Sequence, residues 1–377
     1  MNKLLIFLLF IIKTSLVQAI ETPAKQGILY DYETKTVLFE KNSDELMSPS
    51  SMSKIMTIYY LFKKIKDGEI SIDDEFEVSK KAWKKGGSKM FVNLKSMVRV
   101  EDLIRGIIVQ SGNDACIVVA EGISGSEDIF ADELNELANE IGLESSNFTN
   151  STGWPDKKHL MTVNDLLKLT VRTIEDFPDL YRYYSEKEFT YNDIKQLNRN
   201  PLLFRPIGSD GLKTGHTSLG GYGLVATVKN KDRRLILVLN GLKSSAQRSK
   251  ESERLMKIGF NQFKSIKIAP KTKELGQIPI WSGKKKEVSF YTKDEISITV
   301  PNRDRKKINF KVRYQSPLIA PVAEDQYIAD FLIKKNDQTI KSYKLYATNN
   351  VSESNFFSKM ILNFKFLLFG ESLITTQ

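Results

Sequence analysis

Hydrophobic and polar positions divide the chain into segments of different periodicity. Apolar and polar residues alternate over residues 27–39, around a polar break at 33–35, which predicts a β-hairpin. Over residues 53–65 apolar side chains recur at helical spacing on one dense side, which predicts a buried helix. Three more helical patterns cover residues 101–110, 126–141 and 162–174, and a further helix is expected to resume from residue 114.

The pattern changes to strands after residue 211. Short apolar runs at 212–217, 223–228 and 235–239, joined by short links, predict an antiparallel meander, and a helix at 249–263 follows. The first domain is therefore expected to be α+β, an antiparallel sheet with helices. Beyond residue 270 strict alternation at 296–300, 308–314 and 342–346 predicts a small all-β sandwich or barrel.

The two ends of the chain carry apolar segments of different kinds. Lys3 precedes an apolar run over residues 4–12, and Val17-Gln18-Ala19 fits a signal peptidase site, so residues 1–19 are predicted to be a signal peptide. A membrane-spanning helix is the weaker alternative, because this run is too short for a hydrocarbon core of about 30 Å. Residues 351–377 place aromatic and aliphatic side chains on one stripe and lysines opposite. That arrangement predicts an amphipathic helix in a membrane interface, the alternative being a helix packed on its own domain.

Composition narrows the classes of partner and cofactor. The chain has 56 Lys and Arg against 46 Asp and Glu, a net charge of +10, which favours an anionic membrane or wall polymer. Nucleic-acid binding is not expected, because the chain has no arginine-rich stripe with interleaved aromatic residues. A single cysteine, Cys116, excludes an intramolecular disulfide. The two histidines, His159 and His216, do not form a recognisable zinc motif, so neither metal nor cofactor is expected.

Three short motifs follow one another along the chain: Ser51-Met52-Ser53-Lys54, Ser111-Gly112-Asn113 and Lys213-Thr214-Gly215. Each is weak alone, since a second S-x-x-K pattern occurs at residues 282–285 in the β region. Together they favour a serine hydrolase. Residues three apart on a helix share a face, so Ser51 can meet the amine of Lys54. That lysine can act as a base if burial or a nearby positive charge, expected from Lys213, lowers its pKa.

The remaining motif residues suggest how a peptide would be held. Ser111 is expected to relay a proton toward the leaving amine, and the amide of Asn113 to bind a peptide group of the substrate. Backbone N–H groups at the helix start around Ser51, with that of His216, are expected to form an oxyanion hole. Each motif also has a simpler explanation: Ser51 as a helix cap, Lys54 as a solvated surface lysine, the second motif as an ordinary turn, and the third as part of a strand.

Longer stretches extend the motifs, at residues 49–57, 104–115, 186–190, 196–200 and 210–217. With them the chain resembles the penicillin-recognising serine enzymes, and among these the low-molecular-mass D-alanyl-D-alanine carboxypeptidases, peptidase family S11. The resemblance covers roughly residues 25–370. It implies four segments: a signal peptide at 1–19, a serine D,D-peptidase domain at 20–265, a β-rich domain at 266–350, and a membrane-anchor helix at 351–377.

The resemblance also implies a reaction. Ser51 is acylated by the penultimate D-alanine of a peptidoglycan stem pentapeptide, the terminal D-alanine leaves, and water hydrolyses the acyl-enzyme. β-Lactam antibiotics act as covalent inhibitors. The strand carrying Thr214, Gly215, His216 and Thr217 pairs with the substrate backbone. Arg248 binds the substrate carboxylate together with Thr214 and Thr217. The protein is then exported and peripheral, at the periplasmic face of the bacterial inner membrane.

Competing functions remain within and outside this superfamily. One departure from the family pattern lies at residues 151–155, where many relatives have a histidine before the glycine, and it affects the rim of the site. A β-lactamase commonly carries E-x-x-L-N, but the segment Ala131-Asp-Glu-Leu-Asn135 has alanine in place of the glutamate. A D,D-endopeptidase of the same superfamily and a non-catalytic wall-binding module are two further candidate functions.

Overall fold

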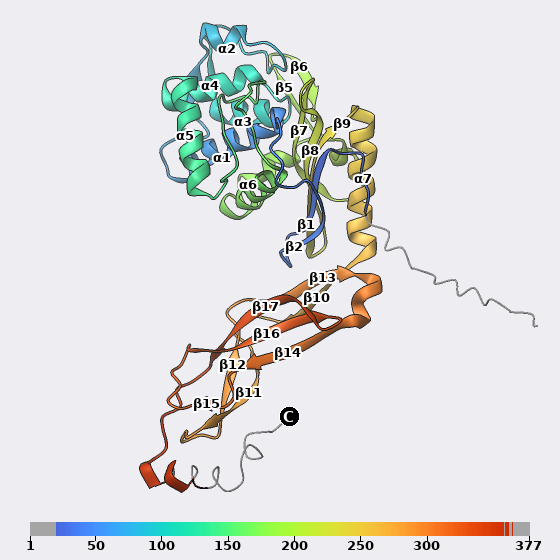
Figure 1. Ribbon diagram of the computed structural model, residues 1–377. Coiled ribbons are helices and arrows are strands. Elements are labelled where there is room, and N and C mark those ends of the chain that lie inside the picture. Colours follow the sequence, from blue (N-terminus) through green and yellow to red (C-terminus); the bar gives the residue numbers. More distant parts are fainter. Residues whose placement is uncertain (1–19, 358, 362–363, 365–377) are drawn as a thin grey trace, which may run out of the picture.

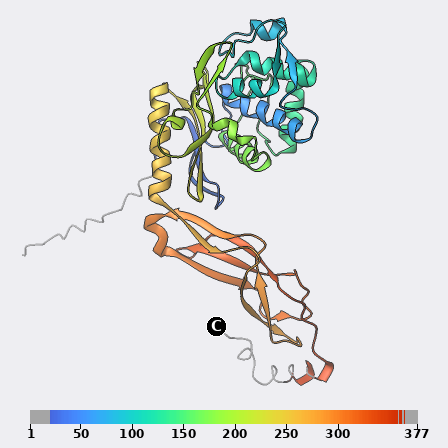
Figure 2. The same ribbon diagram turned by 180° about the vertical axis from the view of Figure 1, so that it is seen from behind.

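The computed structural model describes residues 20–357, 359–361 and 364. Figure 1 shows two parts placed end to end, a wider part made of helices and a sheet and a narrow part made of strands, and Figure 2 shows the same arrangement from behind. Among the residues described, no helix is long and apolar enough to cross a membrane. The predicted signal peptide lies outside the described residues, and so does most of the predicted terminal helix.

A five-stranded antiparallel sheet forms the centre of the first part, in the strand order β2-β1-β9-β8-β7. The predicted hairpin and meander are confirmed. Strand β7 is at one edge, so one side of its backbone is not paired with another strand of this sheet. The strands are β1 Gln26–Asp31, β2 Thr36–Lys41, β7 Ser209–Thr217, β8 Gly221–Asn230 and β9 Arg233–Leu242, with two small pairs, β3 Glu75–Glu77 with β4 Met97–Arg99 and β5 Glu188–Tyr191 with β6 Ile194–Leu197.

Helices lie on both sides of this sheet, α7 on one and the other α-helices on the opposite side (Figure 1). The predicted helical patterns are confirmed to within a few residues, except that α7 begins four residues earlier, at Ser245, where a polar first turn conceals the helical pattern. The helices are η1 Ser50–Ser53, α1 Lys54–Lys66, α2 Lys80–Lys84, α3 Val100–Ile108, α4 Asn113–Ser124, α5 Glu127–Glu140, α6 Val163–Asp176, η2 Tyr181–Ser185, η3 Pro201–Phe204 and α7 Ser245–Gln262.

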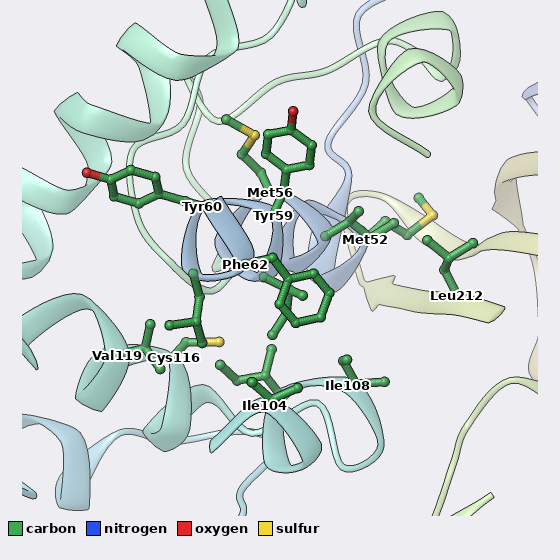
Figure 3. Close-up of a cluster of buried hydrophobic side chains, with 14 of the residues drawn as sticks. Met52, Met56, Tyr59, Tyr60, Phe62, Ile104, Ile108, Cys116, Val119 and Leu212 are labelled. Atoms are coloured by element: carbon green, nitrogen blue, oxygen red, sulfur yellow. The ribbon is translucent and has the colours of Figure 1, made fainter. Parts of the chain in front are cut away.

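Helix α1 runs through the largest apolar core. Its first nine residues, Lys54 to Phe62, are all buried. Figure 3 shows Phe62 directed toward Ile104 and Ile108 of α3, with Cys116 and Val119 of α4 nearby. Burying such aliphatic and aromatic side chains contributes about 1.5–3 kcal/mol each. The same packing carries the polar first residue of the helix, Lys54, into the protein interior.

The second part is all β, as predicted. A six-stranded sheet has the order β14-β16-β17-β12-β11-β15, and a second pair, β10 with β13, packs against it through Ile298, Val300 and Ile333. Two layers around a shared apolar cluster make a sandwich. The elements are β10 Phe263–Ala269, β11 Glu274–Trp281, β12 Glu287–Tyr291, β13 Ile296–Pro301, η4 Asn302–Lys307, β14 Ile308–Tyr314, β15 Leu318–Ile319, β16 Tyr327–Lys335 and β17 Gln338–Ala347.

Buried hydrogen bonds join the two parts. The carboxylate of Asp31, which is fully buried, accepts from the Thr299 hydroxyl at 2.8 Å and from Arg233 Nε at 2.7 Å. The amine of Lys341 donates to the Thr34 carbonyl at 2.7 Å. Bonds to a charged partner are stronger than neutral ones, so this joint ties the β part to the sheet that carries the site.

Candidate active site

The first motif forms the turn that leads into helix α1. Ser51 lies in the short η1 helix, and Lys54 begins α1 directly after it. The amine of Lys54 donates to the Ser51 hydroxyl, with 2.9 Å between Nζ and Oγ. Lys54 has no exposed surface, because the helix that it begins is packed on all sides. The structure therefore places a serine hydroxyl against a buried amine.

Two further acceptors fix the amine of Lys54. Asn113 Oδ1 lies 2.7 Å from Nζ, and the carbonyl oxygen of Thr152 lies 2.5 Å from it. An ammonium has three hydrogens to donate, and with Ser51 these partners take all three. The sequence motifs did not indicate Thr152, because a backbone carbonyl has no residue-type signal.

Gly153 allows the Thr152 carbonyl to come this close. Its φ is +72°, and a Cβ there would lie only 2.0 Å from the carbonyl oxygen of Ser50. A side chain would therefore push the segment 151–155 away from the turn that carries the serine. The departure from the family pattern at these residues thus lies next to the reacting groups.

Burial makes the Lys54 amine a weaker base. It lowers the pKa of Lys54 to about 8, with smaller contributions from the charges of Arg199 and Lys85. Arg199 and Lys85 thus add to the positive charge that was expected from Lys213. Burial also lowers the pKa of Lys213, and the positive charge of Lys54 is the next cause. With a pKa of about 8, the Lys54 amine loses its proton near neutral pH, as a general base must.

The second motif sits between helices α3 and α4. Ser111 adopts a φ of +61°, and its buried hydroxyl has no hydrogen-bond partner among the described residues. Asn113 Nδ2 donates to the Gly86 carbonyl at 2.9 Å, and the neighbouring carboxylate of Asp114 accepts from the Met90 N–H at 2.8 Å. These bonds hold the 86–90 loop against the start of α4. A strained residue with an unpaired hydroxyl is typical of a functional position.

The third motif lies on the edge strand β7. Lys213 and Thr214 are buried there. A Cβ at Gly215 would lie 2.8 Å from the Pro49 carbonyl oxygen, so only glycine lets β7 approach the serine turn this closely. All three motifs, far apart in the sequence, therefore meet around the start of α1.

The predicted carboxylate-binding residues Thr214 and Thr217 lie on this strand, and Arg248 lies in the first turn of α7. His216 stacks on Tyr222 with 3.9 Å between ring centroids, and the Arg248 guanidinium lies 5.7 Å from the same ring. Burial lowers the pKa of Arg248, and its Nε has no partner among the described residues. Thr217 Oγ1 lies 2.9 Å from Ser50 Oγ. A buried guanidinium with a free donor is suited to bind an anion.

Arg199 is a second arginine of the site, which the short motifs did not indicate. Its Nη1 donates to the Ser88 hydroxyl at 2.6 Å, and the next residue, Asn200, donates from Nδ2 to the Gly211 carbonyl at 2.7 Å. The segment 196–200 therefore links the 86–90 loop to β7. Its position could be expected only from the longer family stretch, because a lone arginine carries no pattern.

The other nucleophilic and ligating side chains have structural roles. Burial raises the pKa of the Cys116 thiol to about 12 and lowers the pKa of His159 to about 4, so both are neutral at pH 7. His159 Nδ1 accepts from the Thr149 N–H at 3.2 Å. In the part of the chain that the structure covers, no three His, Cys, Asp or Glu side chains gather to hold a metal ion.

Two family models match the chain, one for each part. Residues 13–244 match the family described as D-alanyl-D-alanine carboxypeptidase, peptidase S11, and residues 263–353 match the penicillin-binding protein 5, C-terminal domain. Helix α7 fills the interval between the two matches, and β10 begins the second.

Two relatives are similar to the chain over nearly its whole length, and a third over about two thirds of it. D-alanyl-D-alanine carboxypeptidase DacC of Escherichia coli is 36% identical over 355 residues, which are 91% of this chain and 88% of the relative. The structure of penicillin-binding protein 5 from Haemophilus influenzae is 35% identical, with a TM-score of 0.82 over 89% of this chain and 100% of that one. Penicillin-binding protein D2 of Listeria monocytogenes, solved in an ampicillin-bound form, is 27% identical with a TM-score of 0.59, over 64% of this chain and 99% of its own. The chain belongs to peptidase family S11, the serine-type D-alanyl-D-alanine carboxypeptidases, and carries the C-terminal domain of penicillin-binding protein 5.

Proposed function

We propose that Ser51 is the nucleophile of this carboxypeptidase and that Lys54 is its general base. The distance of 2.9 Å between Ser51 Oγ and the buried Lys54 Nζ carries this assignment. A neutral Lys54 takes the hydroxyl proton while Oγ attacks the carbonyl carbon of the penultimate D-alanine. The C–N bond then breaks, and the released D-alanine amine receives a proton. Water hydrolyses the resulting ester and restores the serine.

The proton path to the leaving amine is assigned to Ser111 and Lys213. The Ser111 hydroxyl is buried and unpaired among the described residues, so it is available to donate to the departing nitrogen. The lowered pKa of Lys213 makes its proton easier to release to such a relay. Asn113 has a dual role in this proposal. It fixes Lys54 through Oδ1, and Nδ2 keeps a second hydrogen for a substrate carbonyl.

Substrate binding is assigned to β7 and to Arg248 of α7. A stem peptide in extended form adds to the edge of β7, with the His216 N–H and the backbone N–H of Ser51 as oxyanion donors. Arg248, Thr214 and Thr217 bind the terminal carboxylate. The reaction removes only the last residue, because this carboxylate must reach the guanidinium.

β-Lactams are proposed to acylate the same serine. A relative from Listeria monocytogenes was solved in an ampicillin-bound form, which supports penicillin binding by this chain. The strained amide of a β-lactam stands in for the D-alanyl-D-alanine bond, and its opening leaves an ester on Ser51. The β-lactamase alternative lacks support, since Ala131 stands where the extra carboxylate would be needed.

Substitution of the serine tests the assignment. Ser51→Ala is expected to abolish both labelling by a fluorescent penicillin and release of D-alanine from a pentapeptide muropeptide, followed by mass spectrometry. The matched control is Ser282→Ala, which removes the serine of the S-x-x-K pattern at the β-domain turn and leaves both signals unchanged. Labelling of Ser51→Ala at the normal rate would place the nucleophile elsewhere.

We infer further that the protein is exported and held at the periplasmic face of the bacterial inner membrane by residues 351–377. The family of cell-wall enzymes and the exposed apolar side chains near the C-terminus support this location. Deleting residues 355–377 is expected to move the protein from the membrane fraction to the supernatant while penicillin labelling continues. Continued sedimentation of the truncated protein would point to another attachment, such as an uncleaved N-terminal segment.

A further inference from the structure

A basic turn lies in the β part, from β10 to β17, at the end that is farther from the catalytic part, from β1 to α7. It joins β11 to β12 and carries Lys284, Lys285 and Lys286, which are all exposed. Within the described residues, none of the three amines lies in an ion pair with a carboxylate. Glu287, which follows them, offsets one of the three charges, so the turn keeps a net positive charge.

The basic turn, residues 284–286, holds the segment that leads to the C-terminus. The Lys284 N–H donates to the Ser352 carbonyl at 2.9 Å, and the Ser354 N–H donates to the Ser282 carbonyl at 2.8 Å. The chain therefore leaves the β part directly beside the three lysines. Figure 1 shows the first helical turn of this segment at the same end of the molecule.

Apolar side chains are concentrated at this end. Ile319, at the end of β15, is 60% exposed, and five side chains of the C-terminal segment are between 54% and 74% exposed. These five are Phe356, Phe357, Met360, Ile361 and Phe364. Lysines next to exposed aromatic and aliphatic residues match a membrane surface, where headgroups are charged and the layer below is apolar.

We propose that the basic turn binds the anionic headgroups of a lipid bilayer directly, as a second contact beside the C-terminal segment. A single anchor with a small apolar area binds a membrane weakly and reversibly. A neighbouring polybasic patch makes the membrane binding stable. Because the turn is fixed by backbone bonds to residues 352–354, both contacts reach the bilayer together. The β part then stands on the membrane and the catalytic part faces away from it, toward the wall.

The other end of the β part supplies a matched control. Helix η4 carries Arg303, Arg305 and Lys306, which are also exposed and have no ion pair among the described residues. They lie next to the catalytic part, so a membrane that contacts the basic turn does not reach them. Neutralising either set removes the same charge from the same domain.

The inference rests on the proposed membrane location. Vesicle binding by the full-length protein tests the membrane location and the contact of the basic turn separately. Sedimentation is measured with phosphatidylcholine vesicles, with and without phosphatidylglycerol, at several NaCl concentrations. The triple variant Lys284→Gln, Lys285→Gln, Lys286→Gln is expected to bind phosphatidylglycerol vesicles at least about tenfold more weakly at low salt, since each surface lysine accounts for about fivefold. The η4 triple variant Arg303→Gln, Arg305→Gln, Lys306→Gln is expected to bind like the wild type. Penicillin labelling shows that each variant is folded.

Each outcome has one meaning. Equal binding of the basic-turn variant and the wild type, or equal losses in both triple variants, would overturn the direct contact while leaving the membrane location intact. Failure of the wild type to sediment with any vesicle would overturn the location itself. A second measurement needs no substitution: wild-type binding must strengthen with phosphatidylglycerol content and weaken with NaCl, and salt-independent binding would contradict the proposal.

Discussion

The site of the catalytic part and the core of the β part bury different kinds of side chain. Around the start of α1 the catalytic part encloses the amines of Lys54 and Lys213 and the unpaired hydroxyl of Ser111. The core of the β part around β11, β12 and β17 is instead a cluster of aliphatic and aromatic residues such as Ile278, Phe290 and Leu345. Burying an amine is unfavourable for folding, whereas burying leucine is favourable. The catalytic part therefore gives up stability locally for reactivity, and the β part does not.

Removing the buried amine has the largest expected effect. Lys54→Met keeps the length of the side chain and its packing but removes the base, so the acylation rate by penicillin should fall by about 10²–10⁴-fold. The free energy of unfolding is expected to change little, because methionine removes the cost of burying an amine but leaves the Asn113 Oδ1 and Thr152 carbonyl acceptors without a donor. The rate constant of penicillin acylation and a urea denaturation curve measure the two effects.

The control for this substitution lies on the same helix. Lys63 is half-buried and pairs with Asp67 at 2.7 Å, away from the site residues, so Lys63→Met should leave the acylation rate unchanged. If Lys54→Met acylates as fast as the wild type, Lys54 is not the base. The burial of its amine would then not be explained by reactivity.

A leucine in the β part is expected to give the opposite result. Leu345 is fully buried, and Leu345→Ala should lower the free energy of unfolding by about 2–5 kcal/mol through lost burial and a cavity. Penicillin acylation should remain at the wild-type rate, since the site residues described above lie in the other part. Urea denaturation followed by circular dichroism measures the loss.

Ile340 on the same strand provides the control. It is 41% exposed, so Ile340→Ala should change the free energy of unfolding by about 0.5 kcal/mol or less. A slower acylation in Leu345→Ala at unchanged concentration of folded protein would show that the joint at Asp31 and Thr299 transmits packing changes to the site.

The same contrast explains which features could be predicted from the sequence. Period-two and helical patterns predicted the sheet, its meander and a second part that is all β, a sandwich or a barrel, because burial follows apolar periodicity in both parts. The serine, the lysines and Asn113 were identifiable because side-chain chemistry at fixed spacing leaves a motif. The Thr152 carbonyl was not identifiable, because it acts through its backbone. Arg199 had no motif of its own and stood out only within the longer stretch 196–200, because tertiary packing brings it to the site. The start of α7 was also missed, because its first turn is polar and shows no apolar periodicity.

The pH dependence of acylation tests the buried amine without changing any residue. Burial lowers the pKa of Lys54 to about 8, so the amine is mainly protonated below that pH and neutral above it. Only the neutral amine can accept the serine proton, so the rate should rise about tenfold per pH unit below about 7 and level off above about 8.5. Measuring the second-order rate constant of penicillin acylation from acid to alkaline pH tests this, with the residual activity of Lys54→Met as the control that lacks the step. A wild-type rate that is flat across this range would contradict a general base with a pKa of about 8, and Lys54 would then need another role than accepting the serine proton.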